Sequence, residues 1–497
     1  MRSIVPVLLV AVTRLLSAQS ASTVAPKTSQ TAFRTAKTTP KTTIPKTSGA
    51  KLSGAAARRA YHAGTYKRIN ALQTAKVSTH PGRKAALALR PPVVSASLRA
   101  AAFTAVSERM SSAPDRFESG DALKPFFDRL SQSTTRSVPP DSEANQPNSQ
   151  AIHILQYGDS HTASDDWVES MRSVFQSRYG DGGPGFTMPG RPFRGYRRFD
   201  IRGASSPGWV TQGTLGHFGD GRNGLSGVSM TASTPGETLS VTTSGEILEI
   251  YYLRQPGGGA FTLEEDGMQV ETIESNGDLT TGVYTLHPTP GEHTYNVRTL
   301  SYAPVRLFGW VSENRSGVTW ETLGINGAQA NMLLNWDPVV WTQQIQLRDP
   351  ALVLIAYGTN EALSPAWTAE DYRASLLRLI AQFRQAVPNA SLLLVGPPDC
   401  GRLHAFPHLR DVIEIQREVA QQTGIAFWDW RHHMGGPGAT HMWVQAGLSQ
   451  ADYTHLTGDG YRLLGQTLAS EIDLEYRRYV SQPIAAAAPT RDTGFVQ

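Results

Sequence analysis

Strand-like and helix-like segments alternate in two separate stretches of this 497-residue chain. Short apolar runs indicate buried strands, and amphipathic segments with helical periodicity lie between them. Such alternation predicts a parallel sheet that helices cover on both faces, so we expect an α/β fold with three α/β/α layers. The predicted helices span 121–130, about 160–178, 369–386 and 409–423, and the predicted strands span 151–157, 352–357, 391–396 and 425–429.

The stretch between these two halves, from about residue 186 to 318, has a different pattern. It consists of short alternating runs separated by turn residues, without a helical pattern, and Asp266-Gly267 is a typical hairpin turn. Because the flanking segments must share one sheet, we expect a β-sandwich inserted into a discontinuous α/β domain. Its predicted strands span 239–242, 247–254, 261–263, 268–273, 283–287, 293–300 and 305–311.

The first 106 residues are basic, with seventeen Lys and Arg and no acidic residue among Thr, Ala, Ser and Pro. Their low apolar content predicts a disordered basic N-terminal arm over 23–110, within which residues 85–102 could form a weak helix. The rest of the chain has 29 basic and 42 acidic residues, a net charge of about −13 against +4 overall. A positive arm can contact an anionic polymer or a membrane surface, although a solvated linker is the simpler interpretation. No nucleic-acid motif or aromatic platform accompanies it, so we expect no specific nucleic acid partner.

The N-terminus has the features of a signal peptide. A short apolar run at 4–13 follows Arg2, and small residues at 18–20 suit a signal peptidase. We therefore expect a periplasmic or secreted protein without a transmembrane helix in its mature chain, with an unstructured leader as the alternative. The expected divisions are a signal peptide at 1–22, the arm at 23–110, the α/β domain at 111–185 and 319–480, the sandwich at 186–318, and a flexible tail at 481–497.

Three polar segments carry the groups that a serine esterase needs. They are Gly-Asp-Ser at 158–160, Gly-Thr-Asn at 358–360 and Asp-Tyr-Thr-His at 452–455. A serine hydroxyl needs an imidazole to accept its proton and fixed donors to stabilise the oxyanion that follows. The spacing of three allows a carboxylate to reach one ring nitrogen of the histidine and leaves the other for the serine. Each motif alone is weak, but their order and their positions after predicted strands together predict an esterase site.

These residues resemble the SGNH, or GDSL-type, hydrolases, a family of α/β/α esterases and acetyltransferases. The segments 180–186, 324–328 and 357–361 are similar to the bacterial peptidoglycan O-acetylesterase branch, which carries an inserted carbohydrate-binding-like sandwich. The resemblance implies that Ser160 is the nucleophile, that His455 is the general base and that Asp452 orients its ring. It also implies that the oxyanion hole comprises the backbone N–H groups of Ser160 and Gly327 and the side-chain amide of Asn360.

Two positions depart from the commoner family pattern, which has Leu at 161 and Asp at 361. Here the residues are His161 and Glu361, and we consider both as substrate-binding residues. For His161, a polar residue that opens a helix is the alternative interpretation.

The resemblance implies an esterase that removes O-acetyl groups from a polysaccharide, with O-acetylated peptidoglycan as the leading substrate, through an acetyl-enzyme. Such a reaction requires no cofactor. An O-acetyltransferase that passes the same acetyl group to a sugar hydroxyl stays open as an alternative. A non-catalytic glycan-binding protein is a weaker alternative, because all triad members are present.

Other chemically suggestive residues are interpreted more simply. Cys400 is the single cysteine, so it forms no intramolecular disulfide, and we interpret it as incidental to catalysis. We expect no metal site, because the histidines near 432–441 lack regular carboxylate or cysteine spacing. Three tryptophans fit a sugar-binding cleft or buried packing equally well, and they are Trp428, Trp430 and Trp443.

Overall fold

The computed structural model describes residues 94–112, 117–135, 151–401 and 406–481. The expected signal peptide, most of the expected arm and nearly all of the expected C-terminal tail lie outside these residues. Among the residues that are described, no helix is both long enough and apolar enough to cross a membrane.

Five strands form a parallel sheet in which every neighbouring pair runs in the same direction. Four of them were predicted from their apolar runs. In spatial order the strands are β13 (Val318–Gly324), β1 (Ile152–Gly158), β14 (Leu352–Ala356), β15 (Ser391–Val395) and β16 (Ala426–Trp428). β1 therefore lies inside the sheet, at the point where the connections change direction, and in open α/β sheets ligands bind at the carboxyl ends of strands at this point.

β13 was not predicted, because its sequence mixes apolar and polar residues. Thr319, Glu321 and Thr322 are nevertheless completely buried in it. The side chains of Arg348 and Arg172 donate hydrogen bonds to Glu321 and Thr322, and such partners reduce the cost of burying polar groups.

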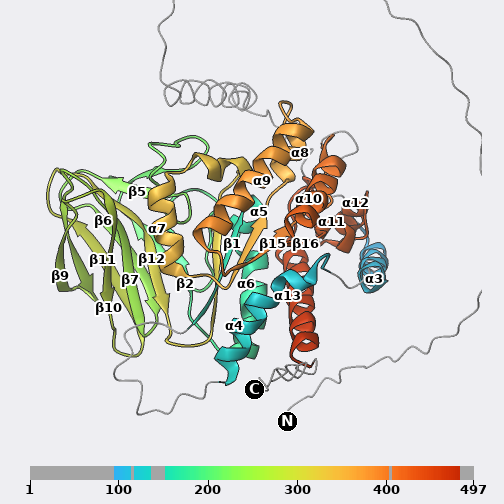
Figure 1. Cartoon of the computed structure of the whole chain (residues 1–497), viewed down its shortest axis with the longest axis horizontal. Helices are drawn as coiled ribbons and strands as arrows, with labels where there is room; N and C mark the ends of the chain where they lie inside the picture. Colours follow the sequence, from blue (N-terminus) through green and yellow to red (C-terminus); the bar gives the residue numbers. More distant parts are fainter. Residues whose placement is uncertain (1–93, 113–116, 136–150, 402–405, 482–497) are drawn as a thin grey trace, which may run out of the picture. The chain divides into compact units, whose positions relative to one another are not determined.

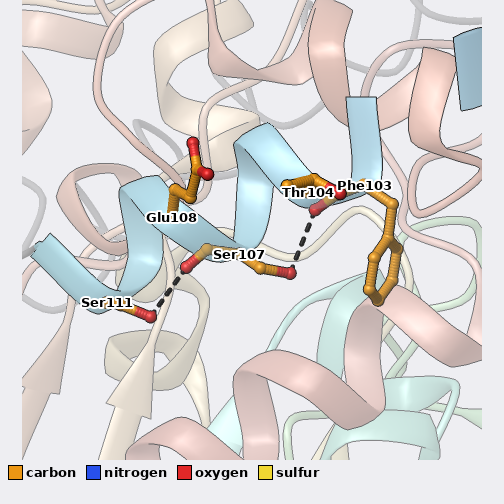
Figure 2. Close-up of a pocket in the computed structure, with 5 residues that line it drawn as sticks. All are labelled: Phe103, Thr104, Ser107, Glu108 and Ser111. Carbon is orange, nitrogen blue, oxygen red and sulfur yellow. Dashed lines mark hydrogen bonds between the residues drawn. The ribbon is translucent and has the colours of Figure 1, made fainter. Parts of the chain in front are cut away.

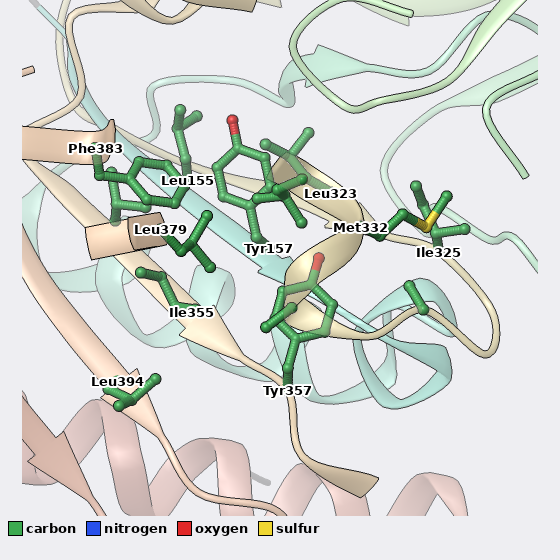
Figure 3. Packing of buried hydrophobic residues seen from close by; sticks show 14 of the residues in the cluster. Leu155, Tyr157, Leu323, Ile325, Met332, Ile355, Tyr357, Leu379, Phe383 and Leu394 are labelled. Atoms are coloured by element: carbon green, nitrogen blue, oxygen red, sulfur yellow. The ribbon is translucent and has the colours of Figure 1, made fainter. Parts of the chain in front are cut away.

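Helices cover both faces of the parallel sheet, as the alternation predicts (Figure 1). On one face, Tyr157 packs edge-on against Phe383 with ring centroids 5.3 Å apart, and Leu155 and Ile355 join the same cluster (Figure 3). The helices of this face are α7 (Pro338–Arg348), α9 (Ala369–Ala386) and α10 (Leu409–Thr423). Those of the other face are α4 (Lys124–Thr135), α6 (Asp166–Tyr179) and α13 (Gly458–Ser481).

Two antiparallel sheets form the predicted β-rich insertion. One contains β10 (Thr280–Leu286), β7 (Ile247–Arg254), β12 (Val305–Glu313), β5 (Ser229–Ala232) and β4 (Val210–Gln212), with β2 (Gly185–Thr187) also paired to β12. The other contains β3 (Arg202–Ser205), β6 (Thr238–Ser244), β11 (Glu292–Thr299), β8 (Ala260–Glu265) and β9 (Met268–Glu274). The seven predicted strands correspond to β6 to β12. The others, of three or four residues each, are too short to show a periodicity.

The strands β7 and β12 are buried on both of their faces. Leu248 and Ile250 of β7 point into the core between the two antiparallel sheets. Tyr251 of β7, with Phe308 and Val311 of β12, belongs instead to the core that includes the parallel sheet and α9. The outer face of this sheet of the sandwich therefore packs into the core of the α/β domain, while its inner face belongs to the sandwich's own core.

Part of the expected arm is an ordered helix, which corrects the expectation for that part. Residues Ala96–Ser112 form α3, which contacts α12 (Ala439–Ala446). Ala102 and Val106 lie four residues apart on one helical face and are buried in the hydrophobic cluster to which α12 and α13 also contribute. These two small apolar residues are too few to stand out against the basic composition of the segment.

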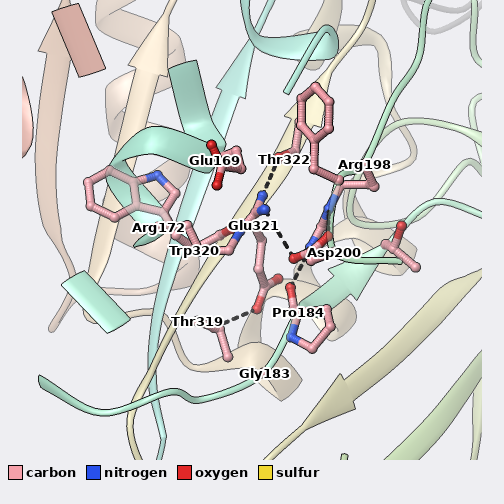
Figure 4. A network of polar contacts seen from close by, with 12 residues as sticks. Glu169, Arg172, Gly183, Pro184, Arg198, Asp200, Thr319, Trp320, Glu321 and Thr322 are labelled. Atoms are coloured by element: carbon pink, nitrogen blue, oxygen red, sulfur yellow. Dashed lines mark hydrogen bonds and ion pairs between the residues drawn. The ribbon is translucent and has the colours of Figure 1, made fainter. Parts of the chain in front are cut away.

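The helix expected at about 160–178 is interrupted. α5 (Ser160–Ala163) has Ser164 as its C-cap, and α6 begins at Asp166. Asp165 between them is completely buried with φ of 62°, a left-handed conformation that Asp tolerates better than most residues. Its carboxylate accepts a 2.7 Å hydrogen bond from Arg172, which holds the break in place. Figure 4 shows Arg172 within the same polar network as Arg198 and Asp200.

Candidate active site

Ser160 lies at the carboxyl end of β1, at the first residue of α5. Gly158 precedes it, and a Cβ there would collide with the side chain of Thr162 and the carbonyl of Ala356. Asp159 caps α5, because its carboxylate accepts a 2.9 Å hydrogen bond from the N–H of His161. The sharp turn from strand to helix thus presents the hydroxyl of Ser160 at the edge of the sheet.

The loop between α12 and α13 brings His455 to this edge. The carboxylate of Asp452 accepts hydrogen bonds from the backbone N–H groups of Thr454 and His455, at 2.9 and 3.0 Å. Tyr453 between them adopts φ of 59°, which closes the turn. The loop therefore holds the carboxylate in a fixed position beside the histidine ring.

Ser160, His455 and Asp452 form one chain of hydrogen bonds. The Nδ1 of His455 lies 2.7 Å from Asp452 Oδ2, and the Nε2 lies 2.9 Å from Ser160 Oγ. Because the carboxylate only accepts, Nδ1–H donates to it and Nε2 accepts the hydroxyl proton of Ser160. This arrangement can deprotonate the serine as it attacks a carbonyl.

The electrostatics of the pair favour the ion pair that would form during such a reaction. Burial would raise the pKa of Asp452, but the hydrogen bonds from His455 and two backbone N–H groups outweigh it and lower the pKa to about 2. The hydrogen bond to Asp452 in turn raises the pKa of His455, although burial opposes this. Asp452 therefore remains charged and stabilises a protonated imidazole.

The three expected oxyanion donors border the same cleft. Ser160, Gly327 and Asn360 all line a hollow of about 510 Å³, together with His455. Gly327 adopts φ of 75°, which suits glycine, and its N–H has no acceptor within the described part of the chain. The side-chain amide of Asn360 donates hydrogen bonds to the carbonyl of Ala328, at 3.0 Å, and to the carboxylate of Asp159, at 3.3 Å.

His161 and Glu361 lie beneath the site rather than in its opening. Both side chains are buried, and neither lines the cleft. The ring of His161 packs with its centroid 5.2 Å from that of His455, and its Nδ1 shares a 2.7 Å hydrogen bond with the hydroxyl of Tyr461. Burial keeps the pKa of His161 well below its usual value. Glu361 accepts a 2.7 Å hydrogen bond from the N–H of Ala330, and burial raises its pKa to about 7. The expectation that His161 and Glu361 contact the substrate is therefore corrected: both side chains support the site from beneath the cleft.

The cleft also contains residues that the sequence analysis did not identify. Arg197, Asn326 and Gln450 line it beside the predicted groups. Arg197 belongs to a segment at 191–202 that contains five arginines, a charge cluster that could have drawn attention. Nothing in the sequence indicates that this segment folds back onto α5, where the N–H of Arg197 donates to the carbonyl of Ala163.

The remaining candidate residues are structural in the described part of the chain. Cys400 is buried, and burial raises the pKa of its thiol, which makes it a poor nucleophile. His433 donates its Nδ1–H to the carbonyl of Asp429 and pairs with Glu471. The three tryptophans are no more than 2% exposed and contribute to packing rather than to a cleft, and they are Trp428, Trp430 and Trp443.

A second hollow, of about 520 Å³, runs along α3 (Figure 2). All of its lining residues come from this helix. The hydroxyls of Ser107 and Ser111 donate to backbone carbonyls one turn earlier, so neither is paired with a base. This hollow therefore has none of the chemistry that the cleft at Ser160 has.

Comparison with known proteins agrees with this geometry. Residues 280–463 match the model of the GDSL-like Lipase/Acylhydrolase family. The chain contains a GDSL-type acylhydrolase domain. The matched part of this domain begins at β10 and includes Asn360, Asp452 and His455. Ser160 precedes the matched part, because the sandwich separates β1 from the other strands of the parallel sheet in the sequence.

Comparison with solved structures extends beyond the matched part of the acylhydrolase domain. One, described as a peptidoglycan O-acetylesterase in action, is 26% identical, covers 71% of this chain and 96% of its own, and superposes with a TM-score of 0.59. A family two carbohydrate esterase from Clostridium thermocellum is 13% identical, covers 54% of this chain and 98% of its own, and has a TM-score of 0.26. A search of curated proteins found no match. The acylhydrolase domain makes this protein an ester-hydrolysing enzyme.

Proposed function

We propose that this protein removes O-acetyl groups from a cell-wall polysaccharide, with O-acetylated peptidoglycan as its substrate. The observation that carries the proposal is the hydrogen-bonded chain from Ser160 through His455 to Asp452 in an open cleft. The similarity to a structure described as a peptidoglycan O-acetylesterase supports this choice of glycan. Such a substrate lies outside the cytoplasm, in agreement with the export expected from the N-terminal sequence.

In the proposed reaction, Ser160 Oγ attacks the acetyl carbonyl while Nε2 of His455 takes the hydroxyl proton. The N–H groups of Ser160 and Gly327 and the amide of Asn360 stabilise the resulting oxyanion. The tetrahedral intermediate collapses to an acetyl-enzyme, and His455 gives the proton to the departing sugar oxygen. Water, deprotonated by the same imidazole, then attacks the acetyl-enzyme, and acetate leaves as Ser160 recovers its proton.

Acetate release from acetylated glycans tests this proposal. We expect the wild-type protein to free more acetate from O-acetylated peptidoglycan than from acetylated xylan or alginate, and Ser160→Ala to lose at least about 10³-fold in rate. Ser173→Ala is the matched control, because its exposed hydroxyl on α6 donates to Glu169 and does not line the cleft. Equal acetate release by Ser160→Ala, or none from any glycan by the wild type, would contradict the proposal. Transfer of the acetyl group to added sugar in place of acetate release would identify a transferase.

A further inference from the structure

A basic and aromatic segment borders the catalytic cleft. Residues 191–202 contain five arginines, three aromatic residues and one acidic residue, whereas the chain after residue 106 carries a net charge of about −13. Charge of one sign concentrated on an oppositely charged body attracts ligands of the other sign. The segment is therefore suited to contact an anionic molecule.

One arginine of the segment holds the loop in place and is not available to a ligand. The side chain of Arg198 is 2% exposed and donates hydrogen bonds to the carbonyls of Pro184 and Phe186, at 2.7 and 2.9 Å. It also pairs with Asp200, which Arg172 contacts at 3.0 Å (Figure 4). The acidic residue of the segment is thus neutralised from two sides, and it does not repel an anion.

Three other arginines are available to an incoming anion. Arg191 is exposed and has no carboxylate partner within the described residues, and the side chain of Arg197 is 59% exposed, with Asp166 3.9 Å away. Arg202 pairs with Glu292, but both side chains are well exposed, so solvent screening makes this pair weak and exchangeable.

These arginines surround a hollow of about 390 Å³ where the segment meets the sandwich. Arg191, Arg197 and Arg202 line it, together with Phe199. Arg197 lines the catalytic cleft as well, so the two hollows adjoin each other at this side chain. A polymer whose acetylated unit lies at Ser160 can therefore place a neighbouring unit in this hollow.

Phe199 supplies a flat apolar surface within the hollow. Phe199 is 56% exposed, and no aromatic ring packs against it among the described residues. Its N–H donates a 3.0 Å hydrogen bond to the buried carboxylate of Asp165, which fixes the backbone beneath the ring. Such a ring can stack on the apolar face of a sugar while nearby charges contact its substituents.

We propose that this hollow is a subsite for a carboxylate-bearing part of the polymer, close to the sugar unit that is deacetylated. The inference rests on the proposed function, and it specifies that the polymer is acidic. Arg191, Arg197 and Arg202 bind the carboxylate, and Phe199 stacks on the sugar ring.

Binding of an unacetylated acidic oligosaccharide to a full-length chain with Ser160→Ala tests the subsite without catalysis. Calorimetry with a galacturonate hexamer is expected to show binding, and maltohexaose is expected to bind at least about tenfold more weakly, because it lacks carboxylates. Molar salt is expected to weaken the binding of the acidic oligosaccharide, since exposed charges are screened. Equal affinity for the two oligosaccharides would overturn the proposal, as would binding that salt does not affect.

Variants assign the binding to these residues. Arg191→Gln with Phe199→Ala is expected to weaken binding of the galacturonate hexamer about tenfold, because it removes one charge and the stacking surface. Arg410→Gln is the matched control, since this arginine is 78% exposed on α10 and lines neither hollow. A similar loss in both proteins would overturn the proposal. Because no acetyl group is involved, failure here leaves the acetate-release test unaffected, and an inactive wild type leaves the binding result interpretable.

Discussion

At the scale of single residues, the protonation state of His455 determines when Ser160 can be activated. Only the neutral ring accepts the serine proton, and the hydrogen bond to Asp452 raises the pKa of His455 above its ordinary value of 6.5. Asp159 adds negative charge from beneath the site and shifts the pKa in the same direction. The active form of the enzyme is therefore expected to become dominant only on the alkaline side of this value.

The pH profile tests this expectation. We predict that kcat/KM for a small acetyl ester rises with pH through an inflection above about 6.5 and then reaches a plateau. Asp452→Asn removes the charge that stabilises the imidazolium, so it should move the inflection to lower pH and reduce the plateau. A wild-type inflection at or below about 6.5, or an unchanged inflection in Asp452→Asn, would disagree with this account.

At the scale of elements, Glu361 connects the two segments that carry oxyanion donors. It belongs to α8 (Thr359–Leu363), directly after Asn360, and it accepts the N–H of Ala330 at the start of the 3₁₀ helix Ala330–Asn335. Gln329 donates a 3.1 Å hydrogen bond back to the carbonyl of Asn360. These two bonds keep Asn360 and Gly327 at a fixed separation, which preorganised oxyanion stabilisation requires.

Removing this connection should affect catalysis more than binding. We predict that Glu361→Ala lowers kcat by about 10- to 100-fold with little change in KM, because the donors lose their alignment. Glu361→Gln retains an acceptor oxygen for Ala330 and is expected to keep most of the activity. Steady-state kinetics with a small acetyl ester distinguishes the two variants, and equal losses in both would count against a positioning role.

Helices could be predicted accurately where the helical periodicity of apolar residues and the capping residues at the helix ends agreed. α9 and α10 match their predicted ranges, because Thr368 caps the first through Asp371 N–H and Gly424 ends the second with φ of 63°. β13 was missed, because a buried strand with charged partners has a weak pattern. α3 was expected only as a weak helix over 85–102, because two small buried residues give little periodicity. Their stability depends on contacts made elsewhere in the fold.

The same contrast holds for the site. Ser160, Asn360, Asp452 and His455 could be identified because each lies in a short motif beside a strand end or a turn. Arg197 could not be placed, because only the tertiary fold brings the segment after β2 back to α5. The buried positions of His161 and Glu361 were likewise unpredictable, since polar residues next to a catalytic motif are usually accessible.

At the scale of the whole molecule, Arg348 joins the sandwich to the parallel sheet. Its side chain is 2% exposed and donates to Glu313 of β12, at 2.9 Å, and to Glu321 of β13. A single buried cation thus compensates two carboxylates from different sheets. Removing one partner of such a group leaves uncompensated buried charge.

Substitution of this arginine should destabilise the whole fold. We predict that Arg348→Met lowers the free energy of unfolding in urea by about 3–5 kcal/mol, because both carboxylates lose their cation. Arg410→Met, at an exposed site on α10, is expected to change it by less than about 0.5 kcal/mol. Similar unfolding midpoints for the two variants would show that the buried cation contributes little.

Because β12 is buried on both of its faces, the inserted sandwich is difficult to exchange by protein engineering. Residues of β12 belong to two different cores: Trp310 packs in the core of the sandwich, and Phe308 packs in the core of the α/β domain. A chimera that grafted a foreign sugar-binding module in place of this one would have to reproduce the shape of both surfaces at once. The inserted sandwich therefore cannot simply be replaced by another domain. A new substrate specificity is more readily engineered by changing the loops around it.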